Sequence, residues 1–270
     1  MDIKILILVV IYAKPLEKSH TILSLKKQSN RDNFDIVIWN NGPDCLESSG
    51  YEVINRVDNP SLSLVYNKII SERNYDYYML FDDDSRFDEE FLNEIYSELY
   101  FSKPMLNIPT VNVLGEKLYP VGFNDGRFKS IASTTIMSGI CIKRDVLDKV
   151  KLKYNDYFDT NYVLYGIDKS FFIRLFHIYG CCKVSLVGEL QHSLSSHENE
   201  SVEKIKYRDY ERGLEVGITI RNYPCFYIFK QTLEFTLLAL RNGRYARIKG
   251  VAVGTLLGKH PRCKGGECLG

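Results

Sequence analysis

The sequence has no apolar run of about 18 residues, the length that a helix needs to cross a bilayer. The apolar-rich opening, residues 3–11, is too short to span, and no small-residue cleavage site follows it. A buried strand explains this run better than a signal peptide. The net charge of +1 provides no long-range field, so it excludes general attraction to nucleic acid or to a membrane.

The sequence also lacks a glycine-rich phosphate loop after the first apolar run, which argues against a sugar nucleotidyltransferase. The seven cysteines are odd in number and scattered, and they include the adjacent pair Cys181 and Cys182. This distribution argues against a secreted disulfide framework, so we expect a protein of the reducing cytoplasm.

Apolar runs alternate with segments of helical periodicity along the first two thirds of the chain. Expected strands are 3–11, 35–39, 77–81, 140–142 and 184–187, and expected helices are 62–70, 87–101, 144–150 and 165–179. Strands that are apolar throughout are covered on both faces, as in parallel sheets. The sequence therefore predicts an α/β fold with a doubly wound, mostly parallel sheet flanked by helices.

The length of 270 residues suits one large domain and an appendage. We expect a domain over 1–197, with a nucleotide-binding half at 1–101 and an acceptor half at 102–197. Composition shifts near residue 198, and 198–270 is expected to be a C-terminal helical region.

Polar residues follow the three strongest predicted strands. Tyr12, Asn40 and Asp82 each lie at the carboxyl end of one strand. Ligands of doubly wound sheets bind at this edge, so the pattern alone predicts a site there.

Three adjacent carboxylates, Asp82, Asp83 and Asp84, stand where a buried strand ends. Two carboxylates about 4 Å apart repel by roughly 4 kcal/mol at an effective dielectric constant of about 20. A divalent cation relieves this repulsion, and oxygen ligands suit Mg²⁺ or Mn²⁺. Strand alternation directs Asp82 and Asp84 to one side and Asp83 to the other. The alternative is a solvated acidic turn in which Asp84 caps the next helix.

Leu80-Phe81-Asp82-Asp83-Asp84-Ser85 resembles the Leu-Phe-Asp-x-Asp-Ser signature of rhamnosyltransferase-like members of glycosyltransferase family 2. Further segments resemble family motifs in the same order, at 9–12, 37–42, 59–67, 138–139, 164–175 and 221–222. The resemblance covers roughly residues 3–225. Four positions depart from the family pattern, namely Ile11, Ala13, Asn40 and Ile167.

The resemblance implies a GT-A fold that binds a nucleotide-sugar donor. It implies donor-binding roles for Tyr12, Asn40, Asn67 and Asp82, and metal ligation by Asp82 and Asp84.

The resemblance also implies that Asp168 is the general base that deprotonates the acceptor hydroxyl. The alternative for Asp168 is a carboxylate that only serves the helix dipole. His192 is a third candidate metal ligand, with a structural histidine as the alternative, and His197 is a weaker candidate. Arg174 is either structural or directed at phosphate.

The C-terminal region combines apolar and basic residues. The apolar-rich segment 226–240 precedes Arg241, Arg244, Arg247 and Lys249. A basic amphipathic segment is typical of peripheral contact with the inner face of a membrane. Packing on the main domain, or on a second subunit of a homodimer, remains open.

The leading hypothesis is an inverting, metal-dependent glycosyltransferase of surface-polysaccharide synthesis. Its donor would be dTDP-rhamnose or a UDP-sugar, and its acceptor a glycan or lipid-linked glycan. The alternative is a catalytically inactive sugar-nucleotide-binding or scaffolding subunit, which the four departures from the family pattern favour.

Overall fold

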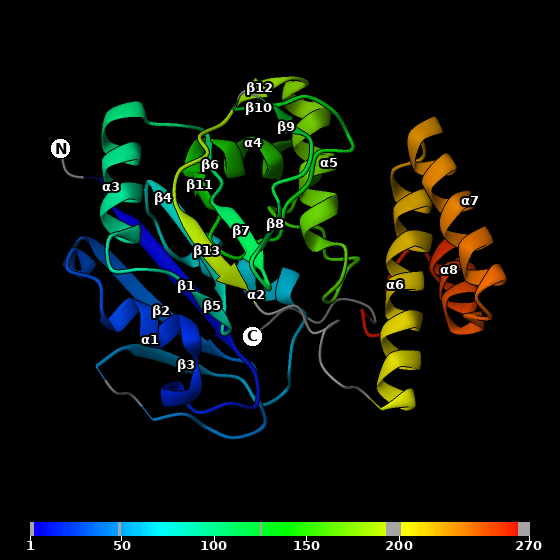
Figure 1. The fold of residues 1–270 in the computed structure, drawn as a ribbon, viewed down its shortest axis with the longest axis horizontal. Helices are drawn as coiled ribbons and strands as arrows, with labels where there is room; N and C mark the ends of the chain where they lie inside the picture. The colour runs from blue at the N-terminus through cyan, green and yellow to red at the C-terminus, as the bar shows by residue number, and fades with distance from the viewer. Residues whose placement is uncertain (1–2, 48–49, 125, 193–200, 264–270) are drawn as a thin grey trace.

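A computed structural model describes residues 3–47, 50–124, 126–192 and 201–263 (Figure 1). Its centre is a six-stranded sheet. In spatial order, the strands are β3 (Glu52–Asn55), β2 (Phe34–Asn40), β1 (Ile5–Ile11), β4 (Tyr77–Asp82), β11 (Cys141–Lys143) and β6 (Leu106–Asn107). Strands β1 to β4 run parallel, whereas β11 runs antiparallel to both neighbours. The α/β class with a mostly parallel sheet is confirmed.

Strand β1 is buried along its whole length because helices cover both faces of the sheet. Its side chains alternate between two hydrophobic clusters: Leu6 and Leu8 join one, and Ile5 and Ile7 join the other. Helices α1 and α3 pack on the Ile5 face, and α2, α4 and α5 pack on the Leu6 face. Two-sided burial explains the uninterrupted apolar sequence.

The helices of this α/β domain connect the strands of the sheet. They are α1 (His20–Lys26), α2 (Leu62–Glu72), α3 (Phe91–Ser102), α4 (Arg144–Tyr154) and α5 (Ile167–Tyr179), with short 3-10 turns η1 (Leu16–Lys18) and η2 (Arg31–Asn33). Helix α3 begins four residues later than residue 87, where it was expected. The Asp88 carboxylate accepts a hydrogen bond from the Glu90 backbone N–H, a local turn that competes with helix.

Two smaller sheets flank the main one. The first contains β5 (Ser85–Arg86), β13 (Glu189–His192), β7 (Thr110–Val113) and β8 (Glu116–Tyr119), and the second contains β12 (Cys182–Lys183), β10 (Arg127–Phe128) and β9 (Phe123–Asn124). The predicted strand 184–187 is wrong: β12 ends at Lys183, and Ser185 forms only an isolated bridge with Asn107. The half-exposed edge strand β3 was not predicted.

Three helices, α6 (Val202–Asn222), α7 (Phe226–Arg241) and α8 (Tyr245–Leu257), form the C-terminal region on one side of the α/β domain (Figure 1). Helices α6 and α8 approach closely through glycines. A Cβ atom at Gly217 would lie 2.3 Å from the Val251 carbonyl oxygen, and one at Gly250 would lie 2.3 Å from the Tyr210 carbonyl oxygen. Any side chain at either position would force the helices apart.

The C-terminal helices are attached to the α/β domain by buried polar contacts. The Tyr162 and Thr219 hydroxyls lie 3.0 Å apart. Arg174 Nε donates to the Tyr223 hydroxyl at 2.7 Å, and Arg174 Nη2 lies 3.2 Å from Asp159 Oδ2. Arg174 is therefore structural, which resolves the alternative left open by its sequence. The expected boundary at residue 197 lies outside the described residues.

No helix within the described ranges is both long enough and apolar enough to cross a membrane.

Candidate functional site

The carboxyl ends of β1, β2 and β4 meet at one edge of the main sheet. In the parallel register, Val10 pairs with Asp82 and Ile11 pairs with Asn40. Tyr12 follows directly, with 56% of its side chain exposed. The structure therefore brings Tyr12, Asn40 and Asp82 to the same edge, where a ligand of a doubly wound sheet binds.

Asp83 faces the loop after β1. Its Oδ1 atom accepts a hydrogen bond from Lys14 Nζ at 2.5 Å, and its backbone carbonyl accepts one from the Ser19 hydroxyl at 2.9 Å. Ser19 also caps α1. Asp83 thus braces the β1–α1 connection, while its two neighbours are directed elsewhere.

Asp82, Asp84 and His192 form a cluster on the other side of the triplet. One ligand atom from each lies within 4.8 Å of the others. Strand β13 places His192 there because it pairs antiparallel with β5, with His192 opposite Ser85. His192 Nδ1 lies 3.1 Å from Asp84 Oδ1. Two carboxylates and one imidazole at this spacing could hold one divalent cation, whose bonds to oxygen are roughly 2.1 Å for Mg²⁺.

Ser138 and Gly139 support this cluster from the side of β11. The Ser138 hydroxyl accepts from the Asp82 backbone N–H at 3.2 Å and lies 2.7 Å from the Ser85 hydroxyl. Gly139 adopts a positive φ, and a Cβ atom there would lie 2.5 Å from Leu190 of β13. The positive φ therefore favours glycine here, and the missing Cβ leaves room for the Leu190 and Pro109 side chains.

Burial controls the charges of the cluster. It raises the pKa of Asp82 to about 7, and repulsion from Asp84 and Asp83 adds to this effect. Burial lowers the pKa of His192, against the attraction of the Asp84 and Asp83 carboxylates. A neutral imidazole is the form that binds metal, and a bound cation would favour the ionised carboxylates.

Asp168 lies in the first turn of α5, two residues after Gly166. Its Oδ1 atom accepts from the Lys169 backbone N–H at 2.8 Å. Burial raises the pKa of Asp168 to about 7, and the charge of Glu215 on α6 raises it further. Asp82 contributes to the same increase, so the two predicted site carboxylates interact electrostatically.

The buried Tyr66 of α2 lies within the electrostatic influence of both carboxylates. Burial raises the pKa of its hydroxyl, and the charges of Asp82 and Asp168 both raise it further. Tyr66 and Glu215 are further candidate site residues, which the sequence alone did not indicate. Neither belongs to a local motif, and Glu215 lies in the region that was expected to be a separate appendage.

The amide of Asn40 is occupied by neighbouring chain segments. Its Nδ2 atom donates to the Asp44 carbonyl and to Asn55 Oδ1, and its Oδ1 atom accepts from the Gly42 N–H. Asn40 is almost completely buried. These contacts fix the loop that follows β2.

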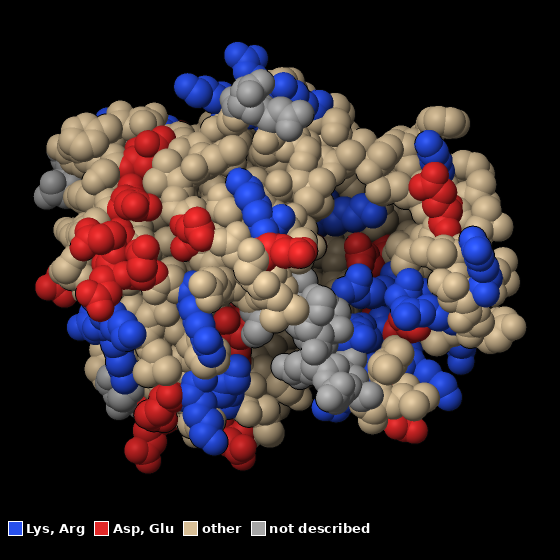
Figure 2. Space-filling model, in the orientation of Figure 1, with Lys and Arg blue, Asp and Glu red and all other residues tan. Residues whose placement is uncertain are grey.

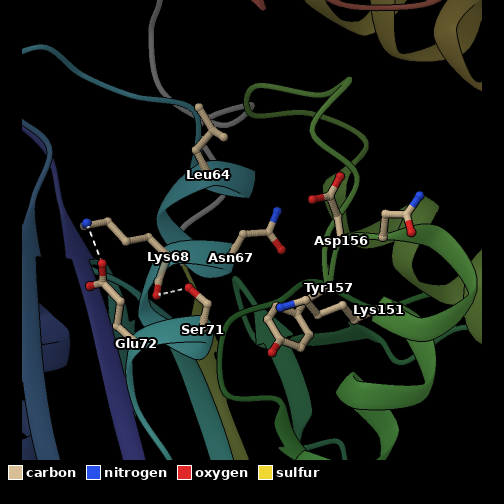
Figure 3. A pocket seen from close by; sticks show the side chains of 9 residues that line it. Leu64, Asn67, Lys68, Ser71, Glu72, Lys151, Asp156 and Tyr157 are labelled. Atoms are coloured by element: carbon tan, nitrogen blue, oxygen red, sulfur yellow. Dashed lines mark hydrogen bonds and ion pairs between the residues drawn. The ribbon is translucent and has the colours of Figure 1, made fainter. Parts of the chain in front are cut away.

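Asn67 projects from α2 beside a cavity of about 280 Å³ that the end of α4 also lines (Figure 3). Its amide holds the Phe158 backbone, accepting from the N–H at 2.9 Å and donating to the carbonyl at 2.8 Å. The Asn67 amide is thus used to hold the segment that follows α4, and none of the clustered residues lines this cavity. His197 lies outside the described residues.

The chain matches no protein-family profile and no curated protein. It is similar to crystal structures of S. aureus TarS. One match has a TM-score of 0.55 and 14% identity, and it covers 85% of this chain but only 43% of that one. TarS 1–349 in complex with UDP-GlcNAc matches with a TM-score of 0.54 and 12% identity over 96% of this chain and 93% of that one. TarS 1–349 in complex with UDP matches with a TM-score of 0.52 and 13% identity.

At this level of identity the likeness establishes the fold. The chain has a GT-A-like glycosyltransferase fold, as the sequence resemblance implied.

Proposed function

We propose that this protein is an inverting glycosyltransferase that moves a sugar from a nucleotide-sugar donor to an acceptor hydroxyl. The observation that carries this proposal is the cluster of Asp82, Asp84 and His192 at the ligand-binding edge of a GT-A-like sheet. Asp168 supports the proposal because it interacts electrostatically with Asp82 and has a pKa of about 7.

The donor side of the site would bind a nucleoside diphosphate. A divalent cation held by Asp82, Asp84 and His192 would neutralise the diphosphate as it leaves. The exposed Tyr12 ring is available to stack on the base or the ribose. Asn40 and Asn67 would contribute indirectly, by fixing the loops that surround the donor. The UDP-GlcNAc and UDP bound to TarS favour a uridine donor over dTDP-rhamnose.

Asp168 would act as the general base. Its carboxylate accepts the proton of the acceptor hydroxyl while that oxygen forms a bond to the anomeric carbon. The bond from this carbon to the diphosphate breaks at the same time, and the nucleoside diphosphate leaves with the electron pair. A base with a pKa near 7 is well matched to proton transfer at neutral pH.

Metal-dependent nucleotide binding is the direct test. We expect UDP or dTDP to bind more tightly with Mn²⁺ present, and Asp82→Ala or Asp84→Ala to abolish this dependence. His192→Ala should reduce the preference for Mn²⁺ over Mg²⁺, because imidazole suits Mn²⁺ better than Mg²⁺. Calorimetric titration measures both effects, with Asp88→Ala, an exposed carboxylate outside the cluster, as the control. Unchanged binding in both aspartate variants would refute the metal site.

If the protein is instead a catalytically inactive subunit, the same protein preparations should give a different outcome. It would bind the nucleotide sugar with metal, yet it would neither hydrolyse the donor nor transfer its sugar to any glycan or lipid-linked acceptor. Donor hydrolysis, measured by the release of the nucleoside diphosphate, therefore separates the two functions.

The outer face of α7 supports a further part of the proposal. Phe226, Phe229, Leu233, Leu237 and Leu240 recur at helical spacing, and each has about half or more of its side chain exposed. Within residues 226–258, cations outnumber the single acid, Glu234. We propose that this apolar stripe rests on an anionic membrane surface on the cytoplasmic side, where lipid-linked acceptors of polysaccharide synthesis would be reached. A homodimer through the same stripe is the competing outcome.

A further inference from the structure

A cavity of about 360 Å³ lies between the beginning of α5 and the helices α6 and α7. Its wall includes Lys169 from α5, Arg212 and Glu215 from α6, and Gln231 and Phe235 from α7. Figure 2 shows the surface hollowed between the α/β domain and the C-terminal helices, with Lys and Arg side chains gathered around the hollow. Small-molecule pockets occupy roughly 300–1,000 Å³, so this cavity suits a ligand the size of a sugar residue.

The cavity adjoins the predicted catalytic carboxylate. Lys169 lines it and directly follows Asp168 in the chain. Glu215 lines it too, and its Cγ atom lies 2.8 Å from where a Cβ atom at Gly166 would be. The Gly166 backbone therefore packs against the side chain of Glu215, and Asp168 lies two residues later in the first turn of α5. Asp168 does not itself line the cavity, so a ligand there would reach it past Lys169 and Glu215.

The wall has the chemistry of a carbohydrate site. Phe235 offers an aromatic ring, which Arg247 covers with its guanidinium at 5.2 Å from the ring centre. Lys169 and Arg212 supply donors, while Glu215 and Glu234 supply acceptors, so the four formal charges cancel. Rings of this kind pack on the apolar face of a sugar, and flanking donors and acceptors suit its hydroxyl groups.

One polar atom of the wall lacks an internal partner. Gln231 Nε2 donates to the Tyr227 hydroxyl at 2.5 Å, which orients the amide. Gln231 Oε1 is buried, and no donor among the described residues bonds to it. Buried acceptors are nearly always satisfied, and a small shift of the Gln231 amide would bring this covered oxygen within reach of a donor that a ligand supplies.

From this geometry we infer that the cavity between α5, α6 and α7 is the acceptor subsite, and that it binds a saccharide residue whose hydroxyl reaches Asp168. The inference rests on the proposed glycosyltransferase function. It assigns to the C-terminal helices a direct part in choosing the acceptor, with Gln231 and Phe235 as specificity-determining residues.

The test measures acceptor and donor binding separately. Saturation-transfer NMR is recorded with octyl glycosides of glucose, N-acetylglucosamine and rhamnose, each below its micelle concentration, in the presence of Mg²⁺ and UDP. We expect at least one glycoside to bind. Gln231→Leu should weaken that binding about fivefold, the change expected for one lost hydrogen bond. Phe235→Ala should weaken it at least as much.

Leu237→Ala is the matched control, because Leu237 lies on the same helix but faces outward. Circular dichroism would check that each variant is folded. The inference is overturned if no glycoside binds, or if binding is the same in Gln231→Leu, Phe235→Ala and the control. Binding of UDP-GlcNAc or dTDP-rhamnose is recorded on the same proteins without added UDP and should not change. Failure of the unmodified protein to bind either donor would count against the proposed function, whereas the glycoside result tests the cavity alone.

Discussion

The two sides of the candidate site are built in different ways. On the donor side, Asp82 and Asp84 belong to one short segment, and strand alternation sets their directions. On the acceptor side, Asp168 depends on Glu215, a residue 47 positions away on α6 (215 − 168). A local motif thus builds the first side, whereas helix packing builds the second. The difference indicates that the C-terminal helices influence the candidate site electrostatically and are not only an appendage.

The largest expected effect tests the catalytic part of this comparison. Asp168→Asn should reduce sugar transfer by about 10²–10⁴-fold, because an amide cannot accept the proton of the acceptor hydroxyl. The nucleotide affinity should stay within about twofold, since Asp168 is not among the residues that would hold the diphosphate. Steady-state transfer kinetics and nucleotide titration measure the two quantities. If the Asp168→Asn variant still transfers the sugar at the original rate, Asp168 is not the general base.

The second prediction separates the acceptor side from the donor side through packing. Gly217→Leu should destabilise the protein by about 1–3 kcal/mol, since its side chain would collide with the α8 backbone. Under conditions in which the variant is still folded, its rate of sugar transfer should fall more than its affinity for the donor, because α6 carries Glu215. Urea unfolding and the two activity assays give these values. Ala252→Leu, on the exposed side of α8, is the control. Equal losses on both sides would show that the helices only stabilise the fold.

The third prediction uses the pKa of about 7 for Asp168. The base is the ionised form, so with saturating metal and donor the transfer rate should rise as the pH increases through 7. Glu215→Gln removes the charge that raises this pKa, and the midpoint of the pH profile should move to lower pH. Lys204→Gln, an exposed substitution on the same helix, should leave it in place. An equal midpoint in all three proteins would show that Glu215 on α6 does not raise the pKa of Asp168 on α5.

The raised pKa values of Asp168 and Asp82 also predict how the stability of the metal-free protein depends on pH. Asp168 and Asp82 both have a folded-state pKa of about 7, above the ordinary value of 3.8. Between these values the folded state binds more protons than the unfolded state. The free energy of unfolding should therefore fall as the pH rises from about 4 to 7. Urea unfolding over this range would show the trend, and added Mn²⁺ should weaken it.

The smallest expected effect concerns the outer face of α7. Phe229→Ser and Leu237→Ser together should weaken flotation with vesicles containing phosphatidylglycerol, by about tenfold for each apolar side chain. Leu152→Ser, on α4 and even more exposed, is the control. If the unmodified protein is instead a dimer in gel filtration and the double variant is a monomer, the stripe joins two copies.

The sequence predicted the fold best where burial is two-sided. The apolar runs of β1, β2 and β4 are uninterrupted because helices cover both faces, so their positions were recognisable. Short and edge elements were not recognisable. Strand β3 is half exposed, and β12 was placed two residues too late, because two-residue strands carry no periodicity.

The sequence by itself determined the sheet, the strand-end position of Asp82 and the opposite directions of Asp82 and Asp83. Each follows from residues that are adjacent in the chain and from the alternation of a strand. Only the tertiary structure decided that His192 joins the aspartates, that Arg174 is structural and that Glu215 acts on Asp168. Each of these depends on contacts between distant segments, whose distances no local pattern encodes.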